Sequence, residues 1–199
     1  MVAMAPVKKI GVLALQGSVA EHLAMLEALP QISALPVKTP EDLRQIDGLI
    51  LPGGESTTIG KLLRIFGLQV PLQARIASGL PVWGTCAGAI LLASEVCGET
   101  AHLGCMDIAI RRNAFGTQLD SFRCATPVAG IPGGPLPMVF IRAPWIEKTW
   151  GRAYPLAEVK GHIVAARQDN LLATSFHPEL TDDLRMHRYF ADMVLSQPQ

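Results

Sequence analysis

Cys86 lies in a segment whose residue types suit a nucleophile. Residues 84–88 read Gly-Thr-Cys-Ala-Gly, between an expected strand and an expected helix. The two glycines allow a sharp strand-to-helix turn in which any Cβ would be crowded. Such a turn places the sulfur near a helix N-terminus, which favours the thiolate, and the N–H of Ala87 can hold an oxyanion. The alternative is a buried structural cysteine beside a packing glycine.

His177 and Glu179 form a second candidate pair. Pro178 favours extended backbone at His177, and residues two apart in an extended chain point the same way. The carboxylate can then reach the imidazole, fix its tautomer and raise its basicity. Taken alone, the pair is better explained as a strand-end histidine with a surface glutamate. A cysteine elbow in the same chain favours a Cys86–His177–Glu179 triad, which only the fold can assemble.

Pro52–Thr58 (PGGESTT) also follows an expected strand and precedes an expected helix. Its glycines allow close backbone approach to a ligand, and free N–H groups there form an anion-binding concavity. A nucleotide phosphate loop is excluded, because Gly54 and Gly60 enclose five residues instead of four and a leucine follows the lysine. A tight turn with a helix cap at Ser56 is the alternative, and it is compatible with a binding role.

The other cysteines and histidines lack such settings. No cysteine spacing fits a zinc site or a disulfide framework, so we expect no metal. We expect three cysteines to be core residues, namely Cys97, Cys105 and Cys124. We expect four histidines to lie at the surface or to be satisfied by hydrogen bonds, namely His22, His102, His162 and His187.

The elements that must position these motifs alternate between apolar strands and amphipathic helices. We expect strands over Lys9–Gln16, Ile32–Lys38, Gly48–Leu51 and Pro81–Thr85. We expect helices over Ser18–Leu29 with a capping box at Ser18, from Thr39 with Pro40 in its first turn, over Ser56–Phe66, Pro71–Ser78 and Ala87–Val96. Such alternation predicts a parallel sheet with helices on both faces, and ligands bind beyond the carboxyl ends of its strands, where the motifs lie.

The second half of the chain has a different pattern. We expect strands over Met106–Asn113 and Val139–Arg142, a Pro/Gly-rich loop over Pro127–Pro137, three short strands within Glu158–Phe176 with turns at Gly161–His162 and Asp169–Asn170, and a helix over Thr181–Leu195. The expected fold class is therefore α/β, with three layers around a mixed, mostly parallel sheet. We expect one domain over residues 1–199, with residues 1–8 as a flexible N-terminal extension.

Composition excludes several classes of function. Hydrophobic residues make up 49% of the 199 residues and charged residues 17%, which argues against disorder. Lys plus Arg and Asp plus Glu are 17 each, so no basic excess is available to bind nucleic acid. The longest apolar stretch, Ala87–Val96, is shorter than the roughly 20 residues that a membrane span needs. Met1–Lys9 lacks the apolar core of a secretory signal, so we expect a cytoplasmic protein.

Six segments resemble, in this order, the glutaminase subunits of pyridoxal 5′-phosphate synthase, a family of class I (triad) glutamine amidotransferases. They are Leu15–Gly17 (LQG), Pro52–Thr58 (PGGESTT), Gly84–Gly88 (GTCAG), Arg112–Gly116 (RNAFG), Phe140–Pro144 (FIRAP) and Ser175–Leu180 (SFHPEL). GTCAG and HPE are shared across triad amidotransferases, whereas LQG, RNxFG and FIRAP are more specific to the subfamily. The resemblance extends from about Lys9 to Val194.

This resemblance implies a class I glutamine amidotransferase-like fold and hydrolysis of L-glutamine to L-glutamate and ammonia, without a cofactor. In the implied mechanism Cys86 attacks the side-chain amide, His177 transfers protons and Glu179 orients His177. The oxyanion N–H groups match Gly54 and Ala87. The family's glutamine-binding positions match Gly54, Glu55, Ser56, Arg112, Ile141 and Arg142. Charges of both signs suit the α-ammonium and α-carboxylate of glutamine.

The resemblance also implies a partner, a (β/α)₈-barrel synthase subunit that receives the ammonia through a tunnel and forms pyridoxal 5′-phosphate, which is a product and not a cofactor. Family members dock on a dodecameric synthase core, up to one glutaminase per synthase subunit, and are nearly silent until docked. Thr117 stands where the family usually has arginine, and Arg111 or Arg123 are candidate substitutes for the lost charge.

Two other functions remain open at this point. A glutaminase subunit of another amidotransferase, such as imidazole glycerol phosphate synthase, has the same triad, although LQG and FIRAP favour the vitamin B6 family. A non-catalytic regulatory subunit on the same fold is the second. The intact Cys86, His177 and Glu179 argue against it.

Overall fold

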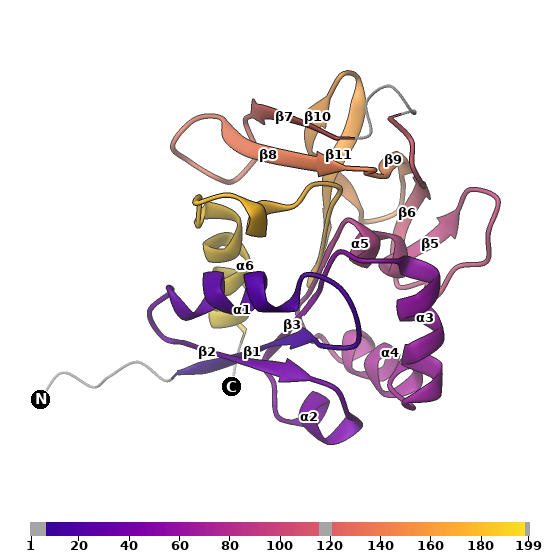
Figure 1. Ribbon diagram of the computed structural model, residues 1–199, viewed down its shortest axis with the longest axis vertical. Helices are drawn as coiled ribbons and strands as arrows, with labels where there is room; N and C mark the ends of the chain where they lie inside the picture. Colours follow the sequence, from indigo (N-terminus) through magenta and orange to yellow (C-terminus); the bar gives the residue numbers. More distant parts are fainter. Residues whose placement is uncertain (1–6, 116–120, 198–199) are drawn as a thin grey trace, which may run out of the picture.

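A ten-stranded mixed sheet forms the centre of the protein. The computed structural model describes residues 7–115 and 121–197 (Figure 1). The strand order is β2-β1-β3-β4-β12-β11-β9-β6-β5, and β10 pairs with β11. Its strands are β1 (Lys8–Leu13), β2 (Ile32–Val37), β3 (Gly48–Leu51), β4 (Val82–Thr85), β5 (Ala93–Val96), β6 (Met106–Arg111), β9 (Trp145–Thr149), β10 (Tyr154–Val159), β11 (His162–Gln168) and β12 (Leu171–Thr174). A separate antiparallel hairpin consists of β7 (Ser121–Thr126) and β8 (Leu136–Ile141).

Strand direction changes across the sheet. Strands β2, β1, β3, β4 and β12 are parallel neighbours, whereas β11 is antiparallel to β12, β9 and β10. At the far edge, β6 is antiparallel to β9 and parallel to β5. Consecutive parallel strands require crossover connections. Helices supply them from β1 to β4, whereas residues 97–105 connect β5 to β6 without a helix. The expected fold class, a mixed and mostly parallel sheet between helices, is confirmed.

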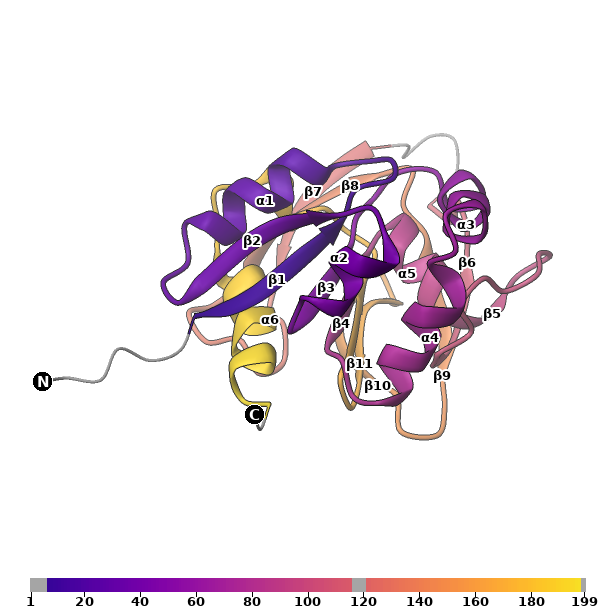
Figure 2. The same ribbon diagram turned by 90° about the horizontal axis from the view of Figure 1, so that it is seen from below.

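Helices cover both faces of the sheet (Figure 2). They are α1 (Val19–Glu27), α2 (Pro40–Arg44), α3 (Ser56–Ile65), α4 (Gln69–Ala77), α5 (Ala87–Leu92) and α6 (Arg185–Leu195), with a 3₁₀ turn η2 (Pro178–Leu180). One core cluster contains apolar residues of α2, α3, α4 and α5, and the other contains those of α1, α6 and the β7–β8 hairpin. Adjacent residues of β4 belong to different clusters, Val82 to the first and Trp83 to the second, because successive side chains of a strand point to opposite faces of the sheet.

Several expected boundaries are wrong. The helix expected over Ala87–Val96 ends at Leu92, and Ala93–Val96 forms β5 alongside β6. A short, continuously apolar run does not distinguish a buried helix from a buried strand. The first strand ends at Leu13, three residues before Gln16, and the last helix begins at Arg185, four residues after Thr181.

Besides β5, two further strands were not expected, β7 and β9. Strand β7 pairs with the next strand, β8, whereas β9 pairs with β6 and β11. The Pro/Gly-rich segment Pro127–Pro137 mostly connects β7 to β8, and its last two residues begin β8. The sheet begins at Lys8, which pairs with Ile32 and lies inside the expected extension. Residues 1–6 of that extension lie outside the described residues.

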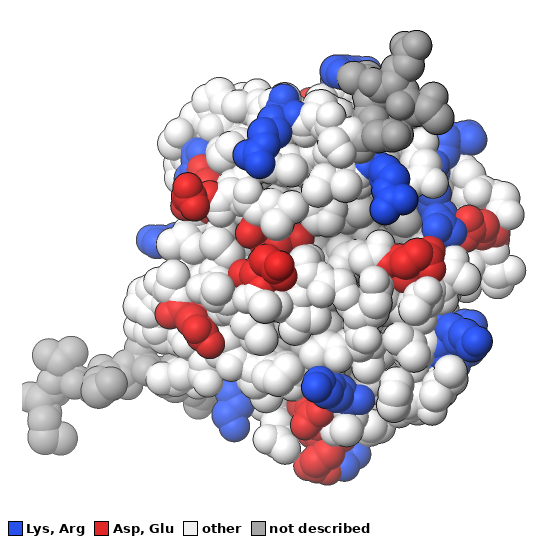
Figure 3. Space-filling view, viewed as in Figure 1, with Lys and Arg blue, Asp and Glu red and all other residues white. Residues whose placement is uncertain are grey.

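The surface carries both signs of charge. In the view of Figure 3, acidic and basic side chains are interspersed among uncharged residues. In the described part of the chain, no helix is long and apolar enough to cross a membrane.

Candidate active site

A cavity of about 420 Å³ lies beside the carboxyl ends of β3 and β4. It is lined by nine of the ten site residues expected from the sequence, namely Gly54, Glu55, Ser56, Cys86, Ala87, Arg112, Ile141, Arg142 and His177. The tenth, Glu179, is buried and bound to His177. Residues from several distant segments therefore meet at one site, as a sheet with ligand sites at its strand ends allows.

Cys86 forms the sharp turn that its neighbours predict. It joins β4 to α5 with φ 49° and ψ −106°, a backbone conformation that residues other than glycine rarely adopt. A Cβ on Gly84 would lie 2.3 Å from the carbonyl oxygen of Gly88, and one on Gly88 would lie 2.0 Å from that of Leu51. Both glycines are thus required for the turn to pack on itself and on β3. The Cys86 N–H donates to Thr174 O at 2.7 Å, which holds the elbow against β12.

The thiol and the imidazole meet over Gly53. A Cβ on Gly53 would lie 2.4 Å from His177 Cε1 and 3.5 Å from Cys86 Cβ. His177 Nδ1 donates to Glu179 Oε1 at 2.7 Å. Burial alone lowers the pKa of His177, but hydrogen bonds with Cys86 and Glu179 outweigh it and raise the pKa to about 10. The imidazolium form of His177 is therefore favoured beside the sulfur.

Glu179 stays ionised although its side chain is inaccessible. Burial alone raises its pKa, but the hydrogen bond from His177 and the nearby imidazoles outweigh it and lower the pKa to about 2. Ser18 Oγ donates to the same oxygen, Oε1, at 2.8 Å. Ser18 occupies the N-cap position of α1 without capping it, so the expected capping box is wrong. The hydroxyl serves the carboxylate 161 residues away instead.

Two histidines behind Glu179 were not expected to have a carboxylate neighbour. His22 and His187 are fully buried, and His22 Nε2 lies 3.5 Å from Glu179 Oε2. Ser18 and His22 are four residues apart at the start of α1, so they share a face. That spacing, next to the LQG segment, is the signal in the sequence that could have indicated Ser18 and His22.

The LQG segment shapes the loop that carries Gly54. Gln16 Oε1 accepts a hydrogen bond from the Glu55 N–H at 2.8 Å, and a Cβ on Gly54 would lie 2.4 Å from the same oxygen. Gly17 has φ 108°, and a Cβ there would lie 1.8 Å from Gly53 O. The backbone contact leaves room only for glycine at position 17, whereas a side chain at position 54 would displace the Gln16 amide.

Glu55, and not Ser56, is the N-cap of α3. Its carboxylate accepts hydrogen bonds from the N–H groups of Thr57 and Thr58. Burial raises the pKa of Glu55, but the hydrogen bonds from Thr58 and the charge of Arg112 outweigh it and lower the pKa to about 2. Ser56 begins the helix, and its buried Oγ has no hydrogen-bond partner among the described residues. Ser56 also lines the cavity.

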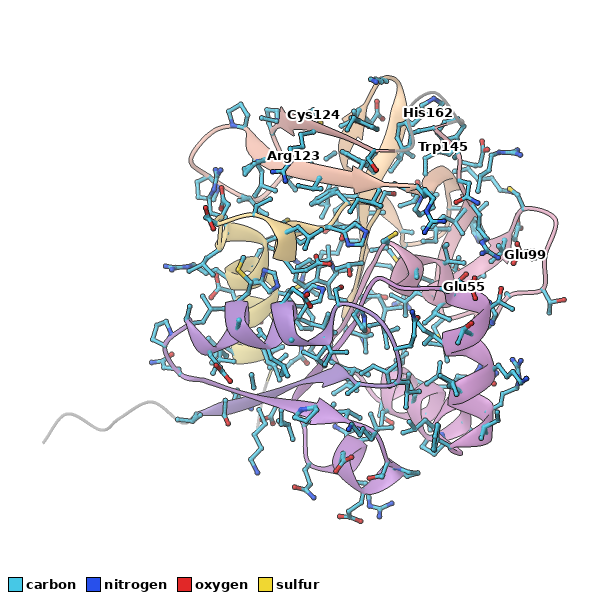
Figure 4. The ribbon with its side chains drawn as sticks, viewed as in Figure 1. Glu55, Glu99, Arg123, Cys124, Trp145 and His162 are labelled. Carbon is cyan, nitrogen blue, oxygen red and sulfur yellow. The ribbon has the colours of Figure 1, made fainter. Side chains whose placement is uncertain are left out.

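Arg112 bridges two carboxylates at the cavity. Its Nη2 lies 2.8 Å from Glu55 and its Nη1 2.8 Å from Glu99. Figure 4 shows Glu55 and Glu99 on the same side of the molecule. Glu99 was not among the expected site residues, because it belongs to no motif and follows β5, a strand that was not expected. Across the cavity, Ile141 ends β8, and Arg142 follows it with φ 42°.

The remaining candidates lie elsewhere. Thr117 is outside the described residues, and of its two suggested substitutes Arg111 is paired with Glu147 while Arg123 lines a separate surface hollow beside Leu180. In Figure 4, Trp145 and His162 lie together, and their rings stack with centroids 3.6 Å apart.

The three cysteines expected in the core are not fully buried. Cys97 is exposed after β5, and Cys105 and Cys124 are half-buried, because each lies at a turn or on an edge hairpin. In the described ranges, no group of three His, Cys, Asp or Glu residues could hold a metal ion.

Comparison with known proteins places the chain in a family. The model of the SNO glutamine amidotransferase family matches residues 12–196. The pyridoxal 5′-phosphate synthase subunit PdxT of Streptomyces coelicolor is 56% identical over 188 residues, which cover 93% of each chain. The PdxT subunit of Ruminiclostridium cellulolyticum is 50% identical, covering 94% of this chain and 100% of the relative.

Solved structures agree with this placement. A crystal structure of a glutamine amidotransferase is 45% identical with a TM-score of 0.88, covering 93% of this chain and 98% of the other. A chain in the structure of PurLQS from Thermotoga maritima, 15% identical with a TM-score of 0.67, covers 96% of this chain and 98% of its own and shares the fold. The chain belongs to the SNO glutamine amidotransferase family.

Proposed function

We propose that the chain hydrolyses L-glutamine to L-glutamate and ammonia, with Cys86 as nucleophile, His177 as proton carrier and Glu179 as the residue that orients His177. One observation carries the proposal: a strained cysteine elbow, a histidine and a buried carboxylate from separate segments meet at one cavity. One glutamine amidotransferase domain over the chain supplies all of these groups. The chemistry uses only side chains, backbone N–H groups and water.

The reaction proceeds in two halves. The Cys86 thiolate attacks the side-chain amide carbon of glutamine, and the N–H groups of Gly54 and Ala87 stabilise the oxyanion. His177 gives its proton to the amide nitrogen, ammonia leaves and a glutamyl thioester remains. Water then attacks the thioester while His177 accepts its proton, which releases glutamate and regenerates the thiolate.

The charged groups at the cavity suit the amino-acid end of glutamine. Glu55 is ionised and offers a negative charge for the α-ammonium, while Arg112 and Arg142 offer positive charge for the α-carboxylate. Ser56 and Ile141 also line the cavity. Glu55 and Arg112 neutralise each other across 2.8 Å, so the pair is preformed before glutamine binds.

The ammonia serves pyridoxal 5′-phosphate synthesis. Relatives at 50–56% identity that carry the name of a pyridoxal 5′-phosphate synthase subunit favour this acceptor over that of another amidotransferase. The partner is then a (β/α)₈-barrel synthase subunit in a dodecameric core, which carries up to one glutaminase per synthase subunit. A complete triad argues against a purely regulatory role.

Glutamate release from glutamine tests this function, measured with the chain alone and with the synthase subunit. We expect strong stimulation by the synthase and loss of activity in Cys86→Ala. Cys97→Ala is the matched control, because Cys97 is exposed and belongs to no part of the cavity. Activity that ignores the synthase would point to another acceptor, and an active Cys86→Ala would refute the nucleophile assignment.

A further inference from the structure

A column of polar side chains continues behind Glu179 into the core. His22 from α1 and His187 from α6 are both 0% exposed, and His22 Nδ1 lies 2.9 Å from His187 Nε2. The other ring nitrogen of His22, Nε2, lies 3.2 Å from Thr85 Oγ1 and 3.5 Å from Glu179 Oε2. Burying two imidazoles costs free energy unless their polar atoms are used. The column therefore calls for an explanation beyond packing.

Two buried atoms without hydrogen-bond partners, His187 Nδ1 and Glu179 Oε2, indicate which ring nitrogens of His22 and His187 carry protons. One of His22 Nδ1 and His187 Nε2 must donate to the other. If His22 Nδ1 donated, neutral His187 would carry its proton on Nδ1, which has no partner among the described residues. His22 Nε2 would then turn a lone pair toward the Glu179 carboxylate, which repels it.

The opposite assignment removes both penalties. When His187 Nε2–H donates, the unpartnered Nδ1 of His187 is a bare acceptor instead of a stranded N–H. His22 then carries its proton on Nε2 and presents it to Thr85 Oγ1 and Glu179 Oε2. At 3.5 Å the contact with Oε2 is an electrostatic attraction and not a short hydrogen bond. Glu179 Oε2 has no hydrogen-bond partner in the described part of the chain, so this contact orients an oxygen that is otherwise unpaired.

We propose that His22 is a positioning residue for the triad, whose Nε2–H, fixed in that tautomer by His187, holds Glu179 Oε2 so that Oε1 remains on His177 and Ser18. The inference rests on the proposed function, because it assigns a role through Glu179 and His177. It adds a group that contacts neither glutamine nor the reacting atoms.

Electrostatics agree with a neutral positioning residue. Burial lowers the pKa of His22 to about 4 and that of His187 to about 3, so both imidazoles are neutral at neutral pH. The charged or titratable groups that face His22 are Glu179, His177 and His187 from other elements and Glu21 from its own helix. A second cation beside Glu179 would compete with the His177 imidazolium for the same carboxylate. A neutral N–H orients the carboxylate without that competition.

A packing role alone predicts something different. The His22 ring also contacts Trp83 edge-on, with centroids 5.8 Å apart. If packing were its only role, substitutions would lower stability without changing how His177 titrates. The two roles can therefore be separated by a measurement on His177.

The experiment compares two amides at position 22 in complex with the synthase subunit. The nitrogen of a glutamine can occupy the place of Nε2, whereas that of an asparagine reaches only the place of Nδ1. We expect His22→Asn to lower kcat about 10-fold with KM unchanged, because Glu179 is then less well oriented, and His22→Gln to retain most of the kcat. In NMR titrations of the free chain, the pKa of His177 should fall in His22→Asn and hold in His22→Gln. His162→Gln, which removes a histidine stacked on Trp145, should leave that pKa unchanged.

A measurement on the unaltered chain keeps the test independent of folding. Imidazole ¹⁵N shifts should show His22 as the neutral Nε2–H tautomer. An Nδ1–H tautomer, equal losses of kcat in both amides, or no loss in either would overturn the proposal. The tautomer of His22 is measured without glutamine. A chain that fails to release glutamate would therefore refute the proposed function, whereas the tautomer would still test the role of His22.

Discussion

A single methyl group added at Gly53 tests the geometry of the triad. The Cβ of an alanine there would lie 2.4 Å from His177 Cε1, whereas ordinary contact begins at 3.4 Å, so the imidazole must move by about 1 Å. Gly53 is not among the described glycines with positive φ, so alanine can adopt its backbone conformation. A displacement of about 1 Å at reacting groups costs about 100-fold in rate. We therefore expect Gly53→Ala to lower kcat by about that factor while the chain stays folded.

The assay is glutamate release at saturating glutamine with the synthase subunit present. Gly48→Ala is the matched control, because it adds the same methyl group on β3, 2.5 Å from Val194 Cγ2 and away from the cavity. It should lower the melting temperature and leave kcat close to that of the unaltered chain. A Gly53→Ala variant with unaltered kcat, or an equal loss in Gly48→Ala, would refute the assignment of the imidazole position.

Three further predictions concern the charges of the site. Glu179→Gln should lower kcat by about 100-fold or more, since the orienting carboxylate of a triad is lost, and should bring the pKa of His177 down from about 10 in an NMR titration. The raised pKa of His177 contributes stability that is fully present below its usual value of 6.5 and lost as pH rises toward 10, so urea unfolding should show this loss in the unaltered chain and not in His177→Asn. Arg112→Ala should raise KM for glutamine about 10-fold or more, and Glu99→Gln should raise it less, because Glu99 only holds Arg112 in place; steady-state kinetics measure both.

Much of the site could be predicted because its chemistry is encoded locally. The glycines around Cys86 indicate their own backbone geometry from a few residues. The extended backbone expected from His177 to Glu179 is wrong, because Pro178–Leu180 forms a 3₁₀ turn, but the turn still brings the carboxylate to the imidazole. The family is confirmed by the model that matches residues 12–196, and the fold class by the strand order and the solved structures. The substrate-binding residues that the resemblance implied all line the cavity. Their roles in binding glutamine remain a prediction.

The rest depends on contacts between distant segments. The hydroxyl of Ser18 suits a helix cap, yet in the fold it serves Glu179, since a buried carboxylate needs donors more than an exposed helix end does. His22 and His187 come from opposite ends of the chain, so nothing local indicates that they touch. Glu99 belongs to no motif and reaches Arg112 only because Ala93–Val96 pairs as a strand with β6.

The central claim is that Cys86 carries the glutamyl group during turnover. The most direct measurement is peptide mass spectrometry of the chain, quenched in acid while it turns over glutamine with the synthase subunit. We predict a glutamyl group on the peptide that contains Cys86 and on no peptide that contains Cys97, Cys105 or Cys124. Continued glutamate release without an adduct on Cys86, accompanied by an active Cys86→Ala variant, would contradict the account.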